Sequence, residues 1–186
     1  MKRLFDFSLA IILILVLLIP TLFLSLIVIL TSRGNVFYWS RRVGINNKIF
    51  KMPKFRTMKI NTPEVASNLI KNPHEFLTPF GGMLRRSSLD EIPQLICILK
   101  GEMSFVGPRP ALYNQEDLIK LRTIHGVDKI IPGLTGWSQI NGRDNLTIEE
   151  KVNLDVEYLN KRSFLFDLKI IFLTAFKTIN RDNISH

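Results

Sequence analysis

The sequence predicts a small α/β domain, rich in helices with short strands, behind an apolar N-terminal segment that enters a membrane. Three observations lead to this prediction. Residues 9–30 contain no charged side chain. The remaining residues alternate between apolar patterns of helical period and short β-prone runs, which Gly and Pro separate. The length, 186 residues, suits one globular unit plus an anchor.

The apolar segment, Leu9 to Leu30, is long enough to cross a bilayer, because at about 1.5 Å per residue it makes a helix of roughly 33 Å. Pro20 lies near its middle, lacks an N–H, and frees the carbonyl of Val16 from its helical partner. Thr21 and Ser25 lie on the next turn, where their hydroxyls suit a helix break in lipid.

Positive charges flank this segment on both sides, with Lys2 and Arg3 before it and Arg33, Arg41 and Arg42 after it. The positive-inside rule therefore gives no preference for sending either end across. Two alternatives stay open from these residues alone: a spanning helix, and a bent helix that enters and leaves by one face. A secretory signal is disfavoured, because the apolar run is long and no clear small-residue cleavage pattern follows it.

The elements after the anchor follow from composition. Val36 to Trp39 is aromatic and β-prone, which suits a short strand or the head-group layer, and Lys48 to Met58 partly alternates. Residues 61–79 hold three prolines and predict an excursion with a short helix around 65–70. Apolar periodicity predicts helices at 92–99, 112–122, 148–159 and 164–176. The last of these, with Asp167 and Lys169 on its polar side, suits a core helix or an interfacial one.

Composition narrows the choice of partners and metals. The 25 Lys and Arg against 16 Asp and Glu give a formal charge of +9, which favours anionic partners. Cys97, the single cysteine, lies in an apolar run and is expected to be buried. The three histidines are scattered, so a zinc site of Cys/His type is excluded and any metal must be held by oxygen atoms.

The candidate chemistry begins with two adjacent carboxylates, Asp90 and Glu91, before an apolar helical run. One interpretation is a capping box, in which Ser88 caps the helix and Glu91 bonds back to it. Pro93 favours another, in which the helix starts near Pro93 and the pair lies on the turn before it. In both, the carboxylates lie at a helix N-terminus, where such a pair can bind Mg²⁺ and supply a nucleophile.

Several arginines lie on turns or near this pair, namely Arg85, Arg86, Arg109 and Arg143. Each has an ordinary alternative, a surface salt bridge, but the planar guanidinium suits phosphate oxygens. Carboxylates, arginines and a membrane anchor in one short chain together predict phosphoryl transfer on a lipid-borne substrate. Two other hypotheses are a non-catalytic basic module that binds anionic lipid or nucleic acid, and a membrane-bound metal-dependent hydrolase.

Four blocks resemble the bacterial monotopic phosphoglycosyl transferases in order and spacing: KFRTM at 54–58, SLDEIPQL at 88–95, LKGEMSFVGPRP at 99–110 and PGLTGWSQINGR at 132–143. With the Pro-broken helix and the segments 155–158 and 163–170, they cover nearly the whole chain. The resemblance implies transfer of a sugar-1-phosphate from a UDP-sugar to polyprenyl (undecaprenyl) phosphate. UMP leaves, and the reaction is the first membrane step of capsule, O-antigen or glycoprotein glycan assembly.

The same resemblance implies residue roles. Asp90 would be the nucleophile of a ping-pong mechanism and would bind Mg²⁺, the cofactor, while Glu91 would assist proton handling. Arg109 and Arg143 match phosphate-binding positions of the family. Further substrate-binding positions are less firmly matched: Lys54, Arg85, Gln139 and Asp155.

The resemblance also implies a topology and partners. Residues 1–32 would form a re-entrant membrane helix broken at Pro20, and residues 33–186 a cytoplasmic catalytic domain with interfacial amphipathic helices. The protein would be monotopic and lie on the cytoplasmic face of the bacterial inner membrane. Its partners would be the UDP-sugar, the polyprenyl phosphate and membrane lipids, with a second copy or downstream glycosyltransferases as further candidates, and no nucleic acid.

Two positions depart from the family pattern. Ile19 stands before Pro20 where many members have Ser, and Ile131 stands before Pro132 where many have a basic residue. Residues 111–115, Ala-Leu-Tyr-Asn-Gln, resemble members that use N-acetylated 6-deoxyamino sugars.

Overall fold

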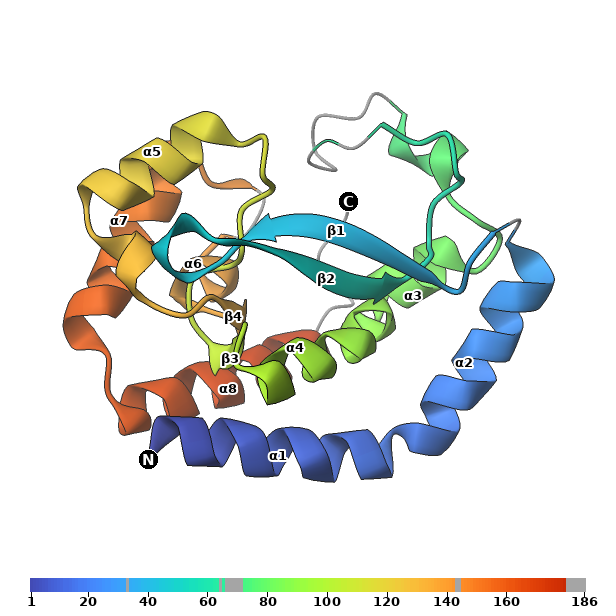
Figure 1. Cartoon of the computed structure of the whole chain (residues 1–186), viewed down its shortest axis with the longest axis horizontal. Coiled ribbons are helices and arrows are strands. Elements are labelled where there is room, and N and C mark those ends of the chain that lie inside the picture. Colours follow the sequence, from blue (N-terminus) through green and yellow to red (C-terminus); the bar gives the residue numbers. More distant parts are fainter. Residues whose placement is uncertain (33, 64, 66–71, 143–144, 180–186) are drawn as a thin grey trace.

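A computed structural model describes residues 1–32, 34–63, 65, 72–142 and 145–179. It confirms a helix-rich α/β domain with short strands (Figure 1). The expected helix around residues 65–70 lies almost wholly outside the described residues. The elements are α1 (Lys2–Val16), α2 (Leu18–Thr31), β1 (Phe37–Val43), η1 (Ile45–Asn47), β2 (Ile49–Phe55), η3 (Pro73–Phe76), α3 (Gly81–Arg86), η4 (Leu89–Gln94), α4 (Leu95–Lys100), β3 (Ser104–Val106), α5 (Glu116–Ile124), η5 (Val127–Lys129), β4 (Gly133–Thr135), α6 (Trp137–Ile140), α7 (Ile148–Lys161) and α8 (Phe164–Ile179).

The apolar segment forms two helices, α1 and α2, that meet at an angle of 62°. Among the described residues no single helix is long and apolar enough to cross a membrane, whereas this bent pair passes that test by length and composition. The bend lies at Leu17, one turn before Pro20, because the proline ring and its missing N–H disturb the preceding turn. The Ser25 hydroxyl donates to the carbonyl of Thr21 at 2.7 Å rather than to the carbonyl that Pro20 frees.

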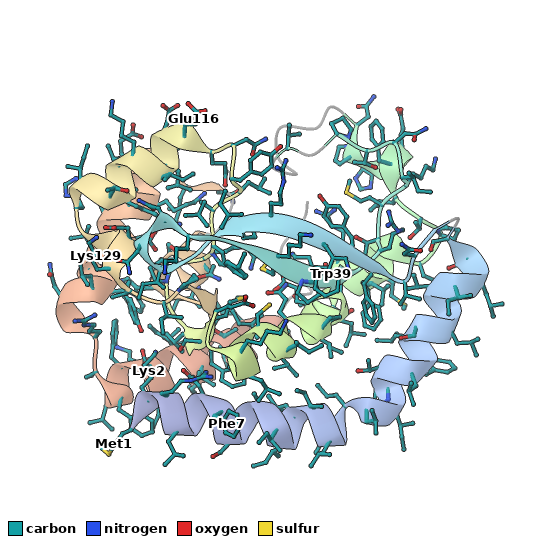
Figure 2. The ribbon with its side chains drawn as sticks, viewed as in Figure 1. Met1, Lys2, Phe7, Trp39, Glu116 and Lys129 are labelled. Carbon is teal, nitrogen blue, oxygen red and sulfur yellow. The ribbon has the colours of Figure 1, made fainter. Side chains whose placement is uncertain are left out.

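The first residues of α1 are bound to the domain. The Lys2 ammonium donates to Asp167 Oδ2 on α8 at 2.5 Å and to the carbonyl of Val106 at 2.9 Å (Figure 2). Arg3 donates to the carbonyls of Ile98 and Leu99, where it satisfies the C-terminal end of α4. These contacts hold the N-terminus of α1 against the domain. The C-terminal end of α2 leads back into the same domain.

Strands β1 and β2 form an antiparallel hairpin with Phe37 opposite Phe55 and Val43 opposite Ile49. Asn46 and Asn47 adopt positive φ at the tip, where asparagine tolerates the left-handed region better than most residues. Successive residues of β1 face opposite sides of the hairpin, so every second residue lies on the same side. The hairpin lies across the middle of the molecule, with α4 between it and α1 (Figure 1).

A second, parallel pair of strands, β3 and β4, was not predicted from the sequence. Gly107 and Gly133 permit it, because a Cβ on Gly133 would lie 2.1 Å from the amide nitrogen of Gly107. Gly107 N–H donates to the carbonyl of Thr135 at 2.9 Å. The chain leaves β3 into the Gly107 to Pro110 loop and leaves β4 into α6, so both segments meet at one end of the pair. Ligands bind at the carboxyl ends of parallel strands in open α/β sheets.

The main core lies between α1, α4, the β3–β4 pair and α8, around residues such as Ala10, Ile98 and Ile170. Helix α8 keeps large apolar side chains exposed on its other face, including Leu165, Phe172 and Phe176. Asp167 is buried on the core side of α8 rather than on a polar side as expected, because it pairs with Lys2 and accepts a hydrogen bond from Tyr158.

Helix α5 begins later than the periodicity predicts. Leu112 instead forms a bridge with Arg42 of β1, and its N–H donates to the side chain of Gln115 at 2.8 Å. Helix α7 agrees with its prediction and begins with a complete capping box, Thr147 and Glu150.

Candidate active site

The two adjacent carboxylates lie in the first turn of η4, a short 3₁₀ helix that continues into α4. Ser88 precedes it with a positive φ of 57° and forms no side-chain cap, so the capping-box interpretation is wrong. Pro93 lies inside η4, where 3₁₀ geometry accommodates it before α4 starts at Leu95. Asp90 and Glu91 therefore lie on the turn that leads into α4, as the second interpretation predicts.

Glu91 is held by two cations from distant segments. Lys54 Nζ of β2 lies 2.8 Å from Glu91 Oε1, and Arg109 Nη2 lies 2.5 Å from the same oxygen. Burial by itself raises the pKa of Glu91, but the charges and hydrogen bonds of Arg109 and Lys54 hold that pKa well below its usual range. Glu91 is therefore a fixed anion in this site.

Asp90 has a different environment although it is the next residue. Its side chain is buried, and within the described ranges no side chain donates a hydrogen bond to it. Burial raises the pKa of Asp90, and the neighbouring charge of Glu91 adds to this, while Lys54, Arg85 and Arg109 oppose it. Two carboxylates with pKa values shifted in opposite directions are typical of a pair with separate catalytic roles.

Lys54 is itself affected by the site. Burial lowers the pKa of its ammonium, and the anion of Glu91 partly restores it. The cation is therefore maintained mainly by its contact with Glu91.

These residues line a cavity of about 470 Å³ between the hairpin, η4 and the segment from α5 to α7. Its charge is strongly positive, as expected for a site that binds phosphate groups. Asp90 and Glu91 are the acidic side chains among the described lining residues. The lining side chains that carry positive charge are Arg42, Lys54, Arg56, Lys59, Arg85, Arg109, Arg122 and Lys151.

The structure brings most of the sequence-predicted site residues to this cavity. Arg85 lies on α3 and donates to the sulfur of Met58 at 3.0 Å. Gln139 lines the wall and donates to the carbonyl of Leu134, while its side-chain oxygen is buried and lacks a partner within the described residues. Arg143 lies outside the described residues.

Asp155 lies behind the wall instead of on it. It is 1% exposed, and Arg122 donates to its Oδ2 from two nitrogens, at 3.0 and 2.6 Å. Ser138 donates to its Oδ1 at 2.9 Å. Both oxygens of Asp155 are thus engaged by residues that themselves line the cavity.

Sequence reasoning missed Arg42 and Arg122 as site residues. Arg42 has a signal in the β1 pattern, since Tyr38, Ser40 and Arg42 alternate along one face and all three line the cavity. The sequence gives no such signal for Arg122, because a single arginine at the end of an amphipathic helix is usually solvated.

The donor set is compatible with Mg²⁺ only as a site that the substrate completes. Groups of three or more acidic, His or Cys side chains that suit a metal are absent from the described residues. Glu91 is occupied by two cations, so Asp90 is the carboxylate of the pair that would hold the ion. Mg²⁺ commonly binds through one or two carboxylates together with substrate phosphates and water, so Asp90 with a diphosphate fits.

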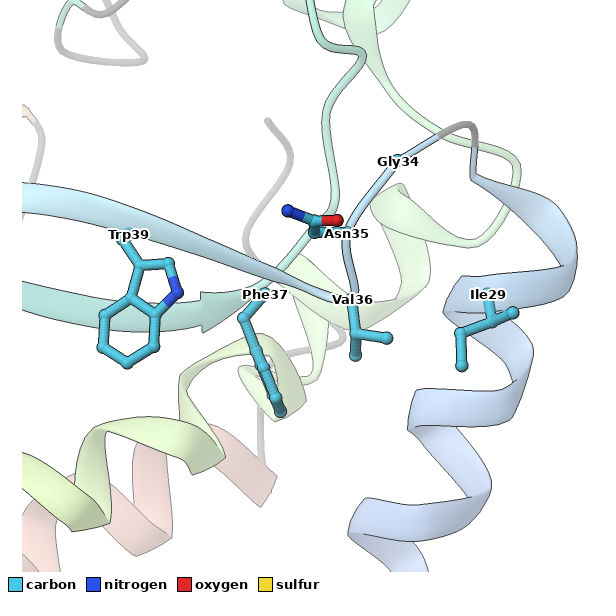
Figure 3. A pocket seen from close by; sticks show the side chains of 6 residues that line it. All are labelled: Ile29, Gly34, Asn35, Val36, Phe37 and Trp39. Atoms are coloured by element: carbon cyan, nitrogen blue, oxygen red, sulfur yellow. The ribbon is translucent and has the colours of Figure 1, made fainter.

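A second hollow lies at the junction of α2 and β1, and the described residues that line it are uncharged (Figure 3). The rings of Phe37 and Trp39 belong to the face of β1 opposite Tyr38 and Ser40. The hairpin therefore separates this hollow from the carboxylates. It is lined by Ile29, Gly34, Asn35, Val36, Phe37 and Trp39.

Cys97 is a buried core residue, as predicted, and burial raises the pKa of its thiol to about 12. We expect the native protein to resist a thiol-specific reagent at pH 8, because the reactive thiolate is almost absent there. The measurement is the rate of labelling by a water-soluble disulfide reagent before and after unfolding in guanidinium chloride. Rapid labelling of the folded protein would contradict the burial of this thiol.

Comparison with known proteins identifies the family of this chain. The sequence profile described as "Bacterial sugar transferase" matches residues 1–181. The chain belongs to the bacterial sugar transferase family. Asp90, Glu91, Lys54 and Arg109 are thus grouped in the cleft of a sugar transferase.

Three relatives of this bacterial sugar transferase cover almost its whole length. "Uncharacterized sugar transferase EpsL" of Bacillus subtilis strain 168 is 40% identical, with 99% of this chain and 90% of EpsL aligned. "UDP-glucose:undecaprenyl-phosphate glucose-1-phosphate transferase" of Escherichia coli K12 is 43% identical over 95% of this chain. That alignment spans only 40% of the E. coli protein. "Exopolysaccharide production protein ExoY" of Sinorhizobium fredii is 38% identical, over 93% of this chain and 83% of ExoY.

Proposed function

We propose that this bacterial sugar transferase moves a sugar-1-phosphate from a UDP-sugar to undecaprenyl phosphate, releasing UMP. The observation that carries this proposal is the cationic cleft around two adjacent carboxylates in different environments. Glu91 is ion-paired to two cations and its pKa is lowered, whereas the pKa of Asp90 is raised. The E. coli relative, by its name, acts on UDP-glucose and undecaprenyl phosphate, which supports the same reaction class here.

In the first half-reaction, an Asp90 oxygen attacks the phosphorus that carries the sugar. The bond from this phosphorus to the bridging oxygen of the diphosphate breaks, and UMP leaves with the electron pair. The product is an acyl phosphate in which an Asp90 oxygen is bonded to the phosphorus of the sugar phosphate. Lys54, Arg85 and Arg109 reduce the repulsion between the carboxylate and the diphosphate, because they place positive charge around the reacting group.

In the second half-reaction, a phosphate oxygen of undecaprenyl phosphate attacks the same phosphorus. The bond between this phosphorus and the Asp90 oxygen breaks, the carboxylate is regenerated, and the polyprenyl-diphospho-sugar leaves. Glu91 holds the side chains of Lys54 and Arg109 in position and remains an anion, so it positions these cations rather than carrying a proton. Asp90 would hold Mg²⁺, which would supply further positive charge to the reacting diphosphate.

Asp155 is proposed as a positioning residue rather than as a direct substrate ligand. Its two oxygens are engaged by Arg122 and Ser138, so little of its charge faces the cavity. Arg143 and Gln139 remain proposed substrate contacts, the first by the resemblance and the second by its place on the wall.

The test of function is an assay of UMP release with the purified full chain, Mg²⁺, undecaprenyl phosphate and a panel of UDP-sugars. The panel includes UDP-glucose and UDP-linked N-acetylated 6-deoxyamino sugars. We propose the latter as donors because residues 111–115 resemble members that use them and line the cavity at Ala111, Leu112 and Gln115. UMP release that does not depend on undecaprenyl phosphate over many turnovers would indicate the hydrolase instead. Absence of UMP release across the panel would overturn the proposal.

We also propose that α1 and α2 enter and leave the membrane by its cytoplasmic face. The contacts of Lys2 with Asp167 and of Arg3 with α4 support this, because the N-terminus of a spanning helix would lie on the far side from the domain. The exposed apolar residues of α1, α2 and α8 would then contact lipid.

We expect a cysteine inserted after Met1, in a Cys97→Ser background, to be protected from an impermeant maleimide in cells with a permeabilised outer membrane and intact inner membrane. Labelling should appear once the inner membrane is disrupted, because both ends of the bent pair lie on the cytoplasmic side. A cysteine at Lys48, an exposed position on the hairpin, is the matched cytoplasmic control. Labelling of the N-terminal cysteine alone in cells with an intact inner membrane would mean that the segment spans.

A further inference from the structure

We propose that Arg122 is a positioning residue that holds the Arg109 loop against Glu91, a role that rests on the proposed function of this cleft. The loop, residues 107–110, reads Gly-Pro-Arg-Pro. Pro108 and Pro110 lack an N–H, so the three residues 108–110 contain only one backbone donor. Such a loop cannot be ordered by its own turn hydrogen bonds and depends on outside donors to its carbonyls.

The structure supplies one outside donor to each of the four consecutive carbonyls of residues 108–111, three in the loop and one directly after it. Gly133 N–H donates to Pro108 at 2.9 Å, and Val43 N–H donates to Ala111 at 2.9 Å. Between these two backbone donors are two guanidinium groups. Arg122 Nη1 donates to Arg109 at 2.8 Å, and Arg42 Nη1 donates to Pro110 at 3.0 Å.

Arg122 donates to the backbone carbonyl of the loop residue whose side chain contacts Glu91. Its carbonyl partner belongs to Arg109, whose side chain lies 2.5 Å from Glu91 Oε1. The other nitrogens of Arg122 are fixed on Asp155, and Asp155 is fixed by Ser138. Since a planar guanidinium has donors in a rigid fork, its orientation on Asp155 determines where Nη1 points. The chain of contacts therefore runs from α7 through α5 to Arg109.

The activity test is a double-mutant cycle on kcat/KM for the UDP-sugar. Arg122→Lys keeps a positive charge beside the buried Asp155 but loses the fork, and we expect a loss of about tenfold, within the range of coupled contacts. Arg109→Met alone should lose on the order of 10²-fold. In the Arg109→Met background, Arg122→Lys should lower kcat/KM by less than about threefold, because the guanidinium group that Arg122 positions is already absent.

A matched cycle uses Arg85→Met in place of Arg109→Met. Arg85 also lines the cavity near Asp90 but is not among the four donors to the loop. The Arg122→Lys loss should therefore remain about tenfold in the Arg85→Met background. An equal loss in all three backgrounds would reduce Arg122 to general structural support and overturn the proposal.

Hydrogen exchange provides a measurement that does not depend on activity. We expect Arg122→Lys and Arg122→Met to speed exchange of the Val43 and Gly133 amides, which donate to the same loop, by about tenfold or more, while α4 amides keep their rates. Unchanged exchange at Val43 and Gly133 in both variants would overturn the positioning role. If the wild-type chain released no UMP from any UDP-sugar, the proposed function would fail while this measurement still decided the role of Arg122.

Discussion

Asp90→Asn should abolish UMP release, with a loss on the order of 10⁴-fold or more, because the amide cannot form the acyl phosphate that the proposed mechanism requires. The variant should fold and bind membranes like the wild type. Asp90 accepts no hydrogen bond within the described residues, and loss of a buried charge with a raised pKa does not destabilise the native state. UMP release in a single turnover, circular dichroism and membrane fractionation measure these three properties.

Asp117→Asn is the matched control, since it makes the same chemical change at an exposed carboxylate on α5. It should retain full activity. Substantial multiple turnover by Asp90→Asn, with Asp117→Asn unchanged, would remove Asp90 from the role of nucleophile.

The same assignment predicts how the rate depends on pH. Because burial raises the pKa of Asp90, its carboxylate should be lost to protonation at a higher pH than an exposed carboxyl group, whose pKa is about 3.9. The pKa of Glu91 is shifted below its usual range, so Glu91 stays ionised as Asp90 takes up its proton. We expect kcat/KM for the donor to fall as the pH is lowered toward this raised pKa. An acid limb at or below pH 4 would contradict the assignment.

Glu91→Gln should lower kcat/KM on the order of 10²- to 10³-fold, a loss similar to removal of one preorganised electrostatic group. The substitution leaves the cations of Lys54 and Arg109 without their anion, so both lose the contact that positions them. It should also destabilise the protein by about 3 kcal/mol, because a buried charge pair is broken from one side. Steady-state UMP release and thermal unfolding in detergent measure the two effects.

Glu91→Gln should also change how the rate depends on pH in the alkaline range. In the wild type, Glu91 opposes the lowering of the Lys54 pKa by burial. Without Glu91, Lys54 should lose its proton at lower pH, and the alkaline limb of the rate should move in the same direction. Glu149→Gln, at an exposed position in the first turn of α7, is the matched control and should leave both the limb and the stability unchanged.

Local features of this protein were predictable because each depends on neighbouring residues. The adjacency of Asp90 and Glu91 before an apolar run places them at a helix start in any fold. Pro20 requires a break in the apolar segment, although the structure locates the bend at Leu17. The hairpin and the helices α7 and α8 follow from alternation and from helical periodicity.

Long-range features were not predictable in this way. The parallel β3–β4 pair consists of two three-residue strands, too short for a periodic signal, and depends on glycines that allow the backbones to approach. Asp167 looked like a surface residue of an amphipathic helix, yet it is buried by an ammonium group from the other end of the chain. Neither contact leaves a pattern in the surrounding residues.

The sequence by itself determined the candidate reactive groups of this sugar transferase, an Asp-Glu pair at a helix start, together with an excess of positive charge and a broken apolar segment. Only the tertiary structure decided how the two carboxylates differ. Lys54 and Arg109, which are 37 and 18 residues from Glu91, meet at one of its oxygens and leave Asp90 without a hydrogen-bond donor among the described residues. Protonation depends on burial and on nearby charge, and packing brings those charges together from distant segments.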